Sequence, residues 1–86
     1  MAGAPFFQFR PRWKEELVVS GPEGSFVLEL PMGNLSAYLP SEDEWARRAP
    51  DWAKPHWRQL NDELQRWCRE NGAMFVIESD ADVYPC

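Results

Sequence analysis

The sequence has few of the residues on which enzymatic chemistry usually depends. It contains one histidine, His56, and two cysteines, Cys68 and Cys86. Any imidazole chemistry must therefore use His56. On a shared helix Cys68 would lie about 18 Å from it along the axis, too far for a hydrogen bond. We interpret both cysteines as free thiols, because Cys68 falls on the apolar side of a predicted helix and Cys86 is the last residue.

Long hydrophobic runs and excess positive charge are also missing. No stretch approaches the roughly 20 apolar residues that span a bilayer. The first ten residues, MAGAPFFQFR, lack the regions of a secretory signal, so we expect a cytoplasmic protein without a membrane partner. The net charge of −5 argues against nucleic-acid binding. Arg10, Arg12 and Lys14 make the start of the chain basic, but they form no extended stripe.

Motifs for phosphate, metal or cofactor binding are absent. Gly21 and Gly24 flank a turn and lack the Lys-Ser/Thr of a phosphate-binding loop. Glu78, Asp80 and Asp82 alternate and could share one side of an extended segment, where hard cations would find oxygen ligands. They lack the glycine and the distant glutamate of a calcium loop. We therefore interpret them as a solvated acidic tail, and we expect no metal, no cofactor and no catalytic residues.

Tryptophan is what the chain has in excess. Four of its five tryptophans lie between Trp45 and Trp67. A buried tryptophan contributes a large apolar area to a core, whereas an exposed one can anchor a partner. The sequence leaves open which of the two this cluster does.

The first half of the chain has the composition of strands. Residues 17–20, 25–30 and 35–39 are separated by turn residues, which indicates a three-stranded meander. The aromatic segment 6–9 is a candidate edge strand for strand addition or dimerisation. Residues 73–77 are apolar throughout and predict a final, well-buried strand that returns to the sheet.

The second half is predominantly helical. The run Ser41-Glu42-Asp43-Glu44 matches a capping box, in which Ser41 and Glu44 bond each other's amides, and Pro50 ends this first helix. A longer helix is predicted to begin near Lys54-Pro55 and to end at Asn71-Gly72. Its apolar stripe consists of Trp57, Leu60, Leu64, Trp67 and Cys68. We therefore predict a single α+β domain over residues 1–86. A three- to four-stranded antiparallel sheet would be covered on one face by a short and a long amphipathic helix, in a βββααβ-like order.

The middle third of the chain resembles a pattern in small uncharacterised bacterial proteins. The resemblance rests on Tyr38–Trp45, with its Pro-Ser-acidic-Trp helix start, and on Ala49–Lys54, with its Pro-x-Trp-Ala step. Those proteins share a strand, such a helix start and a long amphipathic helix. The resemblance implies a bacterial origin and a ββαβ-like arrangement, and it implies no activity.

These features favour a small acidic protein-interaction module, either a regulator or an immunity- or antitoxin-like inhibitor. Its partner is expected to be another protein or a second copy of the chain. The candidate partner-binding residues are Trp13, Trp45, Trp52, Glu42 and Asp43. The alternative is a small-ligand-binding or hydrolytic domain that uses clustered carboxylates and tryptophan. An acid pair lining a Trp-sided cleft would favour this alternative, and a continuous aromatic–acidic patch would favour the interaction module.

Overall fold

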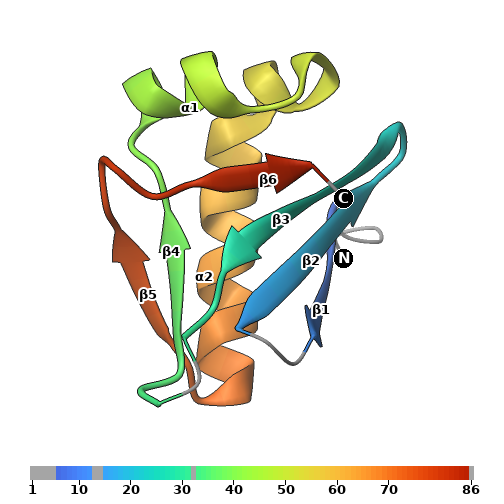
Figure 1. Cartoon of the computed structure of the whole chain (residues 1–86). Coiled ribbons are helices and arrows are strands. Elements are labelled where there is room, and N and C mark those ends of the chain that lie inside the picture. Colours follow the sequence, from blue (N-terminus) through green and yellow to red (C-terminus); the bar gives the residue numbers. More distant parts are fainter. Residues whose placement is uncertain (1–5, 13–14, 32, 86) are drawn as a thin grey trace.

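The computed structural model describes residues 6–12, 15–31 and 33–85. The described elements are β1 (Gln8–Arg12), β2 (Glu16–Gly21), β3 (Gly24–Glu29), β4 (Ser36–Leu39), α1 (Glu42–Arg48), the 3-10 helix η1 (Asp51–His56), α2 (Trp57–Asn71), β5 (Met74–Ile77) and β6 (Val83–Pro85). Strands β1, β2, β3 and β6 form an antiparallel sheet in that order, and β4 and β5 form a second, parallel sheet. The predicted α+β class with a four-stranded antiparallel sheet is confirmed (Figure 1).

The centre of the larger sheet is the β2–β3 hairpin. Gly21 pairs with Gly24, so a two-residue turn connects the strands, as the turn residues of the sequence indicate. Apolar side chains at alternate positions of both strands are fully buried. They are Leu17, Val19, Phe26 and Leu28, and they form cross-strand pairs on the face that packs against α2.

The predicted meander is wrong in its third strand. Strand β4 does not continue the antiparallel order but pairs in parallel with β5. The reason is the connection between them, because a chain that leaves one strand and returns through helices arrives parallel to it. The segment Val83–Pro85, predicted as part of a polar tail, forms β6 beside β3.

The helices begin and end close to the predicted positions. Ser41 caps α1, with its Oγ accepting a hydrogen bond from the Glu44 amide at 3.4 Å, whereas the Glu44 carboxylate is engaged by Arg47 and Arg48. Helix α2 begins at Trp57, slightly later than predicted, because the preceding residues form η1 around Pro55.

Helix α2 supplies one wall of the core. Its residues Leu60, Leu64 and Cys68 are buried, which confirms the apolar stripe. Gly72 ends the helix in the left-handed region with φ of 69°, a conformation that glycine adopts without strain. Figure 1 shows α2 behind both sheets, with α1 and η1 across their upper end. Among the described residues, no helix is long and apolar enough to cross a membrane.

Candidate functional site

Trp45, a predicted partner contact, is completely buried. Its indole Nε1 donates a hydrogen bond to the Ala53 carbonyl at 3.1 Å, and its ring packs edge-to-face on Phe26 with centroids 5.3 Å apart. A buried indole with its N–H satisfied stabilises a core. The prediction that Trp45 contacts a partner is therefore wrong, because this side chain presents no surface.

Trp52 is half-buried and covers the turn of the β2–β3 hairpin. A Cβ atom at Gly21 would lie 2.6 Å from its ring, so the turn can accept the indole only where it has no side chain. The ring also packs near Phe7 and Phe26, with centroid distances of 6.2 and 6.0 Å. The observed contacts of Trp52 are packing contacts, and a role in partner binding stays a prediction.

The two predicted acidic contacts, Glu42 and Asp43, are exposed at the start of α1. Glu42 lies 3.7 Å from the Arg58 guanidinium, in an exposed ion pair that contributes little to stability. Trp13, the remaining predicted residue, lies outside the described part of the chain. Since Trp45 points into the core, it does not join the acids in a shared surface patch.

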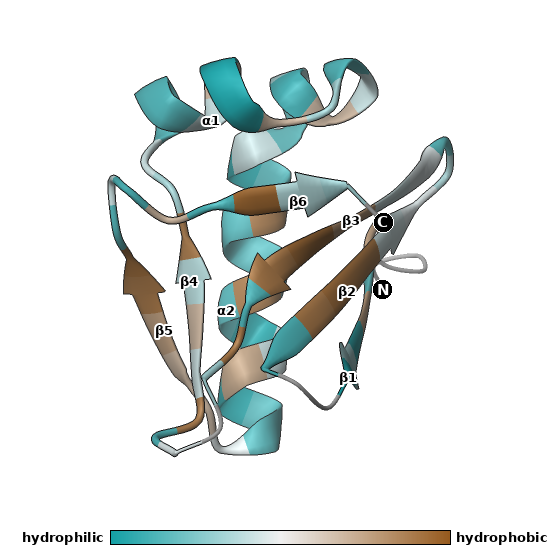
Figure 2. Ribbon diagram, viewed as in Figure 1, coloured by the Kyte–Doolittle hydropathy of each residue, from teal (hydrophilic) through white to brown (hydrophobic). Residues whose placement is uncertain are grey.

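An apolar surface occurs instead on β5, which the sequence predicted to be well buried. The strand is confirmed, but its burial is wrong: Met74 is 63% exposed and Ile77 is 47% exposed. The strand lies at the margin of the molecule with hydrophobic residues along its length (Figure 2). Its exposure follows from the sheet order, because β5 has β4 on one side and no described strand on the other.

Along one edge of β5, no strand of the described residues pairs with the backbone. The Met74 amide donates to the Leu35 carbonyl at 2.8 Å, and the Glu78 amide donates to the Leu39 carbonyl at 2.9 Å. In a parallel pair the residues that bond to the neighbouring strand alternate with residues that point away from it. The N–H and C=O groups of Phe75 and Ile77 therefore point away from β4.

Two of the other three outer strands of the described sheets, β1 and β6, are protected. Strand β1 carries Pro11, which has no N–H, between the exposed Arg10 and Arg12. Strand β6 has only three residues and ends with Pro85. Short length, proline and charge are the usual means of preventing a sheet edge from pairing with another chain. Strand β5 has neither proline nor charge between Met74 and Ile77.

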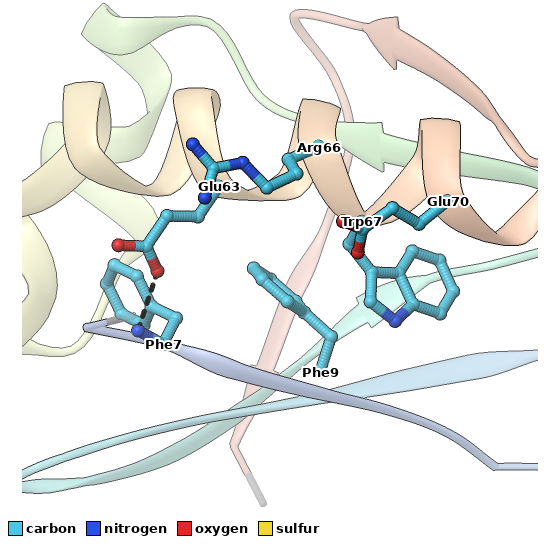
Figure 3. Close-up of a pocket in the computed structure, with 6 residues that line it drawn as sticks. All are labelled: Phe7, Phe9, Glu63, Arg66, Trp67 and Glu70. Carbon is cyan, nitrogen blue, oxygen red and sulfur yellow. Dashed lines mark hydrogen bonds between the residues drawn. The ribbon is translucent and has the colours of Figure 1, made fainter. Parts of the chain in front are cut away.

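A second candidate site is a shallow cleft of about 270 Å³ between β1 and α2. Its apolar part is formed by the rings of Phe9 and Trp67, with centroids 6.1 Å apart, and Arg66 lies at its margin (Figure 3). The two acids that line it are Glu63 and Glu70. A tryptophan wall with a pair of acids is the feature that would favour the alternative function, a ligand-binding domain.

The two acids of the cleft differ in their surroundings. Both carboxylate oxygens of Glu63 accept backbone hydrogen bonds, from Phe6 N at 2.9 Å and Phe7 N at 2.7 Å. Gln59 also donates to this carboxylate. Glu70 follows two helical turns later, about 10 Å along the helix axis, and is exposed. Glu63 therefore fixes the segment that leads into β1, whereas Glu70 faces solvent at the cleft.

The alternating acids after β5 do not assemble a metal site. Within the described residues, no group of three or more His, Cys, Asp or Glu side chains is arranged to hold a metal ion. The chain turns after Glu78, where the Ala81 amide donates to the Glu78 carbonyl at 2.9 Å. Asp82 instead pairs with Arg48 at 3.0 Å and accepts a hydrogen bond from the Tyr84 hydroxyl at 3.1 Å.

Tyr84 is a surface residue whose acid–base behaviour is perturbed by its neighbours. Its hydrogen bond to Asp82, followed by partial desolvation and the charge of Glu29, raises the pKa of the phenol to about 12. The Glu29 carboxylate lies 3.2 Å from the same hydroxyl. These contacts fasten β6 to the larger sheet, so we assign them a structural role.

Neither candidate surface was predicted as a site from the sequence. The apolar composition of β5 was visible, but nothing local distinguished an edge strand from a central one. The cleft joins residues more than fifty positions apart, whose proximity depends on the fold. Comparison of the chain with protein-family models, with curated proteins and with solved structures found no match.

Proposed function

We propose that this chain is a protein-interaction module that binds another polypeptide by strand addition along the free edge of β5. The observation that carries the proposal is the exposed, uncharged and apolar strand Met74–Ile77, whose outer backbone groups face away from β4. An extended partner gains main-chain hydrogen bonds along such an edge and side-chain contacts on either side of it.

The two-stranded size of the smaller sheet supports the same proposal. A sheet of two strands has few backbone hydrogen bonds, and a third strand would add both hydrogen bonds and apolar contacts. The contrast with β1 and β6 is further support, since these two outer strands carry proline and β5 does not.

The charges that flank β5 favour a particular partner. Glu78 and Asp80 follow the strand and are exposed, so a positive charge beside this end of β5 would be attracted. The specific module that we propose is a regulator or an immunity- or antitoxin-like inhibitor. Its origin would be bacterial, as the resemblance implies. Strand addition is a means by which such a module could hold its target.

A displayed library of random peptides tests strand addition without knowledge of the natural partner. The protein would be immobilised sparsely, so that each copy stands alone, and Ile77→Lys would serve for counter-selection. We expect peptides with alternating apolar residues that bind wild type and lose binding to Ile77→Lys. Gln8→Lys is the matched control, because it adds the same charge at the protected edge β1 and should retain binding. If no peptide binds, or if the bound peptides do not distinguish Ile77→Lys from wild type, the proposal is wrong.

The cleft between β1 and α2 carries a second candidate function, the binding of a small aromatic ligand. Phe9 and Trp67 offer ring faces, and Arg66 and Glu70 offer one charge of each sign at the cleft. Titration with a set of small aromatic compounds of either charge, followed by NMR, should move the Trp67 indole signal. Trp67→Leu should remove the response of the remaining cleft residues. Equal responses in both proteins would exclude this function.

A further inference from the structure

The free edge of β5 is complementary to itself. Phe75 and Ile77 both point their backbone N–H and C=O groups away from β4, as the bonds of Met74 and Glu78 to β4 indicate. In an antiparallel pair of two β5 strands, Phe75 of one copy can lie opposite Ile77 of the other. The two residues then exchange both backbone bonds, and the reciprocal pair does the same. This register places Val76 opposite Val76 on a two-fold axis.

We infer that the strand added to β5 is β5 of a second copy of this chain, antiparallel and centred on Val76. The inference rests on the proposed function, since it names the partner of the same edge. The product is a continuous four-stranded sheet in the order β4-β5-β5′-β4′, where the prime marks the second copy. Because the two copies use the same surface, the assembly closes at two subunits and leaves neither β5 edge free.

The side chains fit this arrangement on both faces of the strand. Val76 does not belong to the core cluster. By alternation along β5 it shares a face with Met74, and this face is turned away from the core. Val76 would meet its own equivalent across the axis at the short spacing of non-hydrogen-bonded pairs. On the other face, Phe75 and Ile77 alternate across the junction, so apolar residues meet apolar residues throughout.

The charged groups around β5 permit a second copy in this orientation. The end of α2 before β5 carries Arg69 and Glu70, and the segment after β5 carries Glu78 and Asp80, all of them exposed. Antiparallel pairing brings Glu78 and Asp80 of one copy towards the end of α2 of the other, where Arg69 is the group of opposite sign.

The like charges are separated by the same register. Glu78 of each copy is displaced from its equivalent by four residues, about 13 Å along the strands. That distance exceeds the screening length of about 8 Å at physiological ionic strength, so the two Glu78 carboxylates repel each other little in this register.

The register can be tested by disulfide trapping. In a Cys86→Ser background, Val76→Cys places two thiols across the axis, where the Cα spacing of about 4.5 Å permits a disulfide. Cys68 can remain, because its burial raises the pKa of the thiol to about 11 and keeps it protonated. We expect Val76→Cys to form a covalent dimer rapidly under mild oxidation. Met74→Cys alone should not, since its equivalents are about 13 Å apart.

A mixture sharpens the same test. Met74→Cys and Glu78→Cys proteins, each in the Cys86→Ser background, should form a mixed disulfide with one another, because these positions are opposite in the inferred register. If Met74→Cys forms homodimers as rapidly as Val76→Cys, the antiparallel register centred on Val76 is wrong.

Sedimentation equilibrium measures the association itself. Wild type should show a monomer–dimer equilibrium, and Ile77→Lys should weaken it at least about tenfold, whereas Gln8→Lys should not change it. Met74→Lys should tighten the dimer about fivefold by placing a lysine opposite Glu78 of the second copy, and Met74→Glu should weaken it. Both substitutions are at a side chain that is 63% exposed, so we expect the monomer to remain folded.

The outcomes separate this inference from the proposed function. If wild type stays monomeric up to about 1 mM, the second copy is not the partner. If peptides selected from the library nevertheless require Ile77, strand addition stands and the partner is a different chain. If neither self-association nor peptide binding depends on β5, both proposals fall.

Discussion

The outer strands β1 and β5 differ in the residues that protect a sheet edge from pairing with another chain. Strand β1 places Pro11 between two exposed arginines, and Glu63 holds the backbone just before it. Strand β5 has only Met, Phe, Val and Ile, two of them largely exposed. The difference between these two edges is the observation behind the strand addition that we propose for β5.

The largest difference in the free energy of unfolding should appear between alanine substitutions of one side chain at each edge. Phe7, which leads into β1, is 1% exposed, and Phe7→Ala should lower the free energy of unfolding by about 3–5 kcal/mol. Met74→Ala on β5 should change monomer stability by less than about 0.5 kcal/mol, because this side chain is exposed. Urea unfolding at low protein concentration measures both. A large loss for Met74→Ala would mean that β5 is anchored like β1, and the comparison would fail.

A smaller effect is expected from removing the carboxylate that holds the start of β1. Glu63→Ala leaves the Phe6 and Phe7 amides without their acceptor, at a cost of about 2 kcal/mol. Glu70→Ala is the control, because this acid lines the same cleft and is exposed. Amide exchange near Phe7 should accelerate in Glu63→Ala alone. Equal unfolding free energies for the two variants would show that Glu63 does not fasten this edge.

Removing the protection of β1 should give the molecule two sheet edges that can pair with another chain, at β1 and at β5. The double variant Arg10→Thr/Pro11→Val restores an N–H and removes a charge, while the Arg12–Glu16 ion pair remains. We expect open chains rather than closed dimers, with self-association about tenfold stronger, by light scattering. Adding Ile77→Lys should return the double variant to dimers, formed through β1. A double variant that assembles no further than wild type would contradict the protective role of Pro11.

The sequence predicts those parts of the fold that depend on neighbouring residues. The buried stripe of α2, the cap at Ser41 and the β2–β3 turn all follow from local spacing and backbone geometry. The glycine that ends α2 follows from the same local rules.

The sequence does not predict which strands become neighbours. Strand β5 was expected to be buried because an apolar run is typical of a central strand, and its position at an edge depends on the distant pairing with β4. Trp45 was predicted as a partner contact and is buried. An amphipathic side chain beside acids suits a surface as well as a core. Its burial depends on Phe26 and Ala53, which the fold brings to it.

The outer strand β6 should give the smallest effect, and one that depends on pH. Its Tyr84 hydroxyl lies within hydrogen-bonding distance of Asp82 and Glu29, and these contacts raise the pKa of the phenol from 10.0 to about 12. Since the folded state holds the proton more tightly than the unfolded state, the contribution is complete below pH 10 and is lost as pH rises towards 12. Tyr84→Phe should remove this alkaline loss of stability, whereas Tyr38→Phe should retain it, as measured by urea unfolding at several alkaline pH values. An unchanged alkaline profile in Tyr84→Phe would mean that the contacts of the Tyr84 hydroxyl with Asp82 and Glu29 do not stabilise β6.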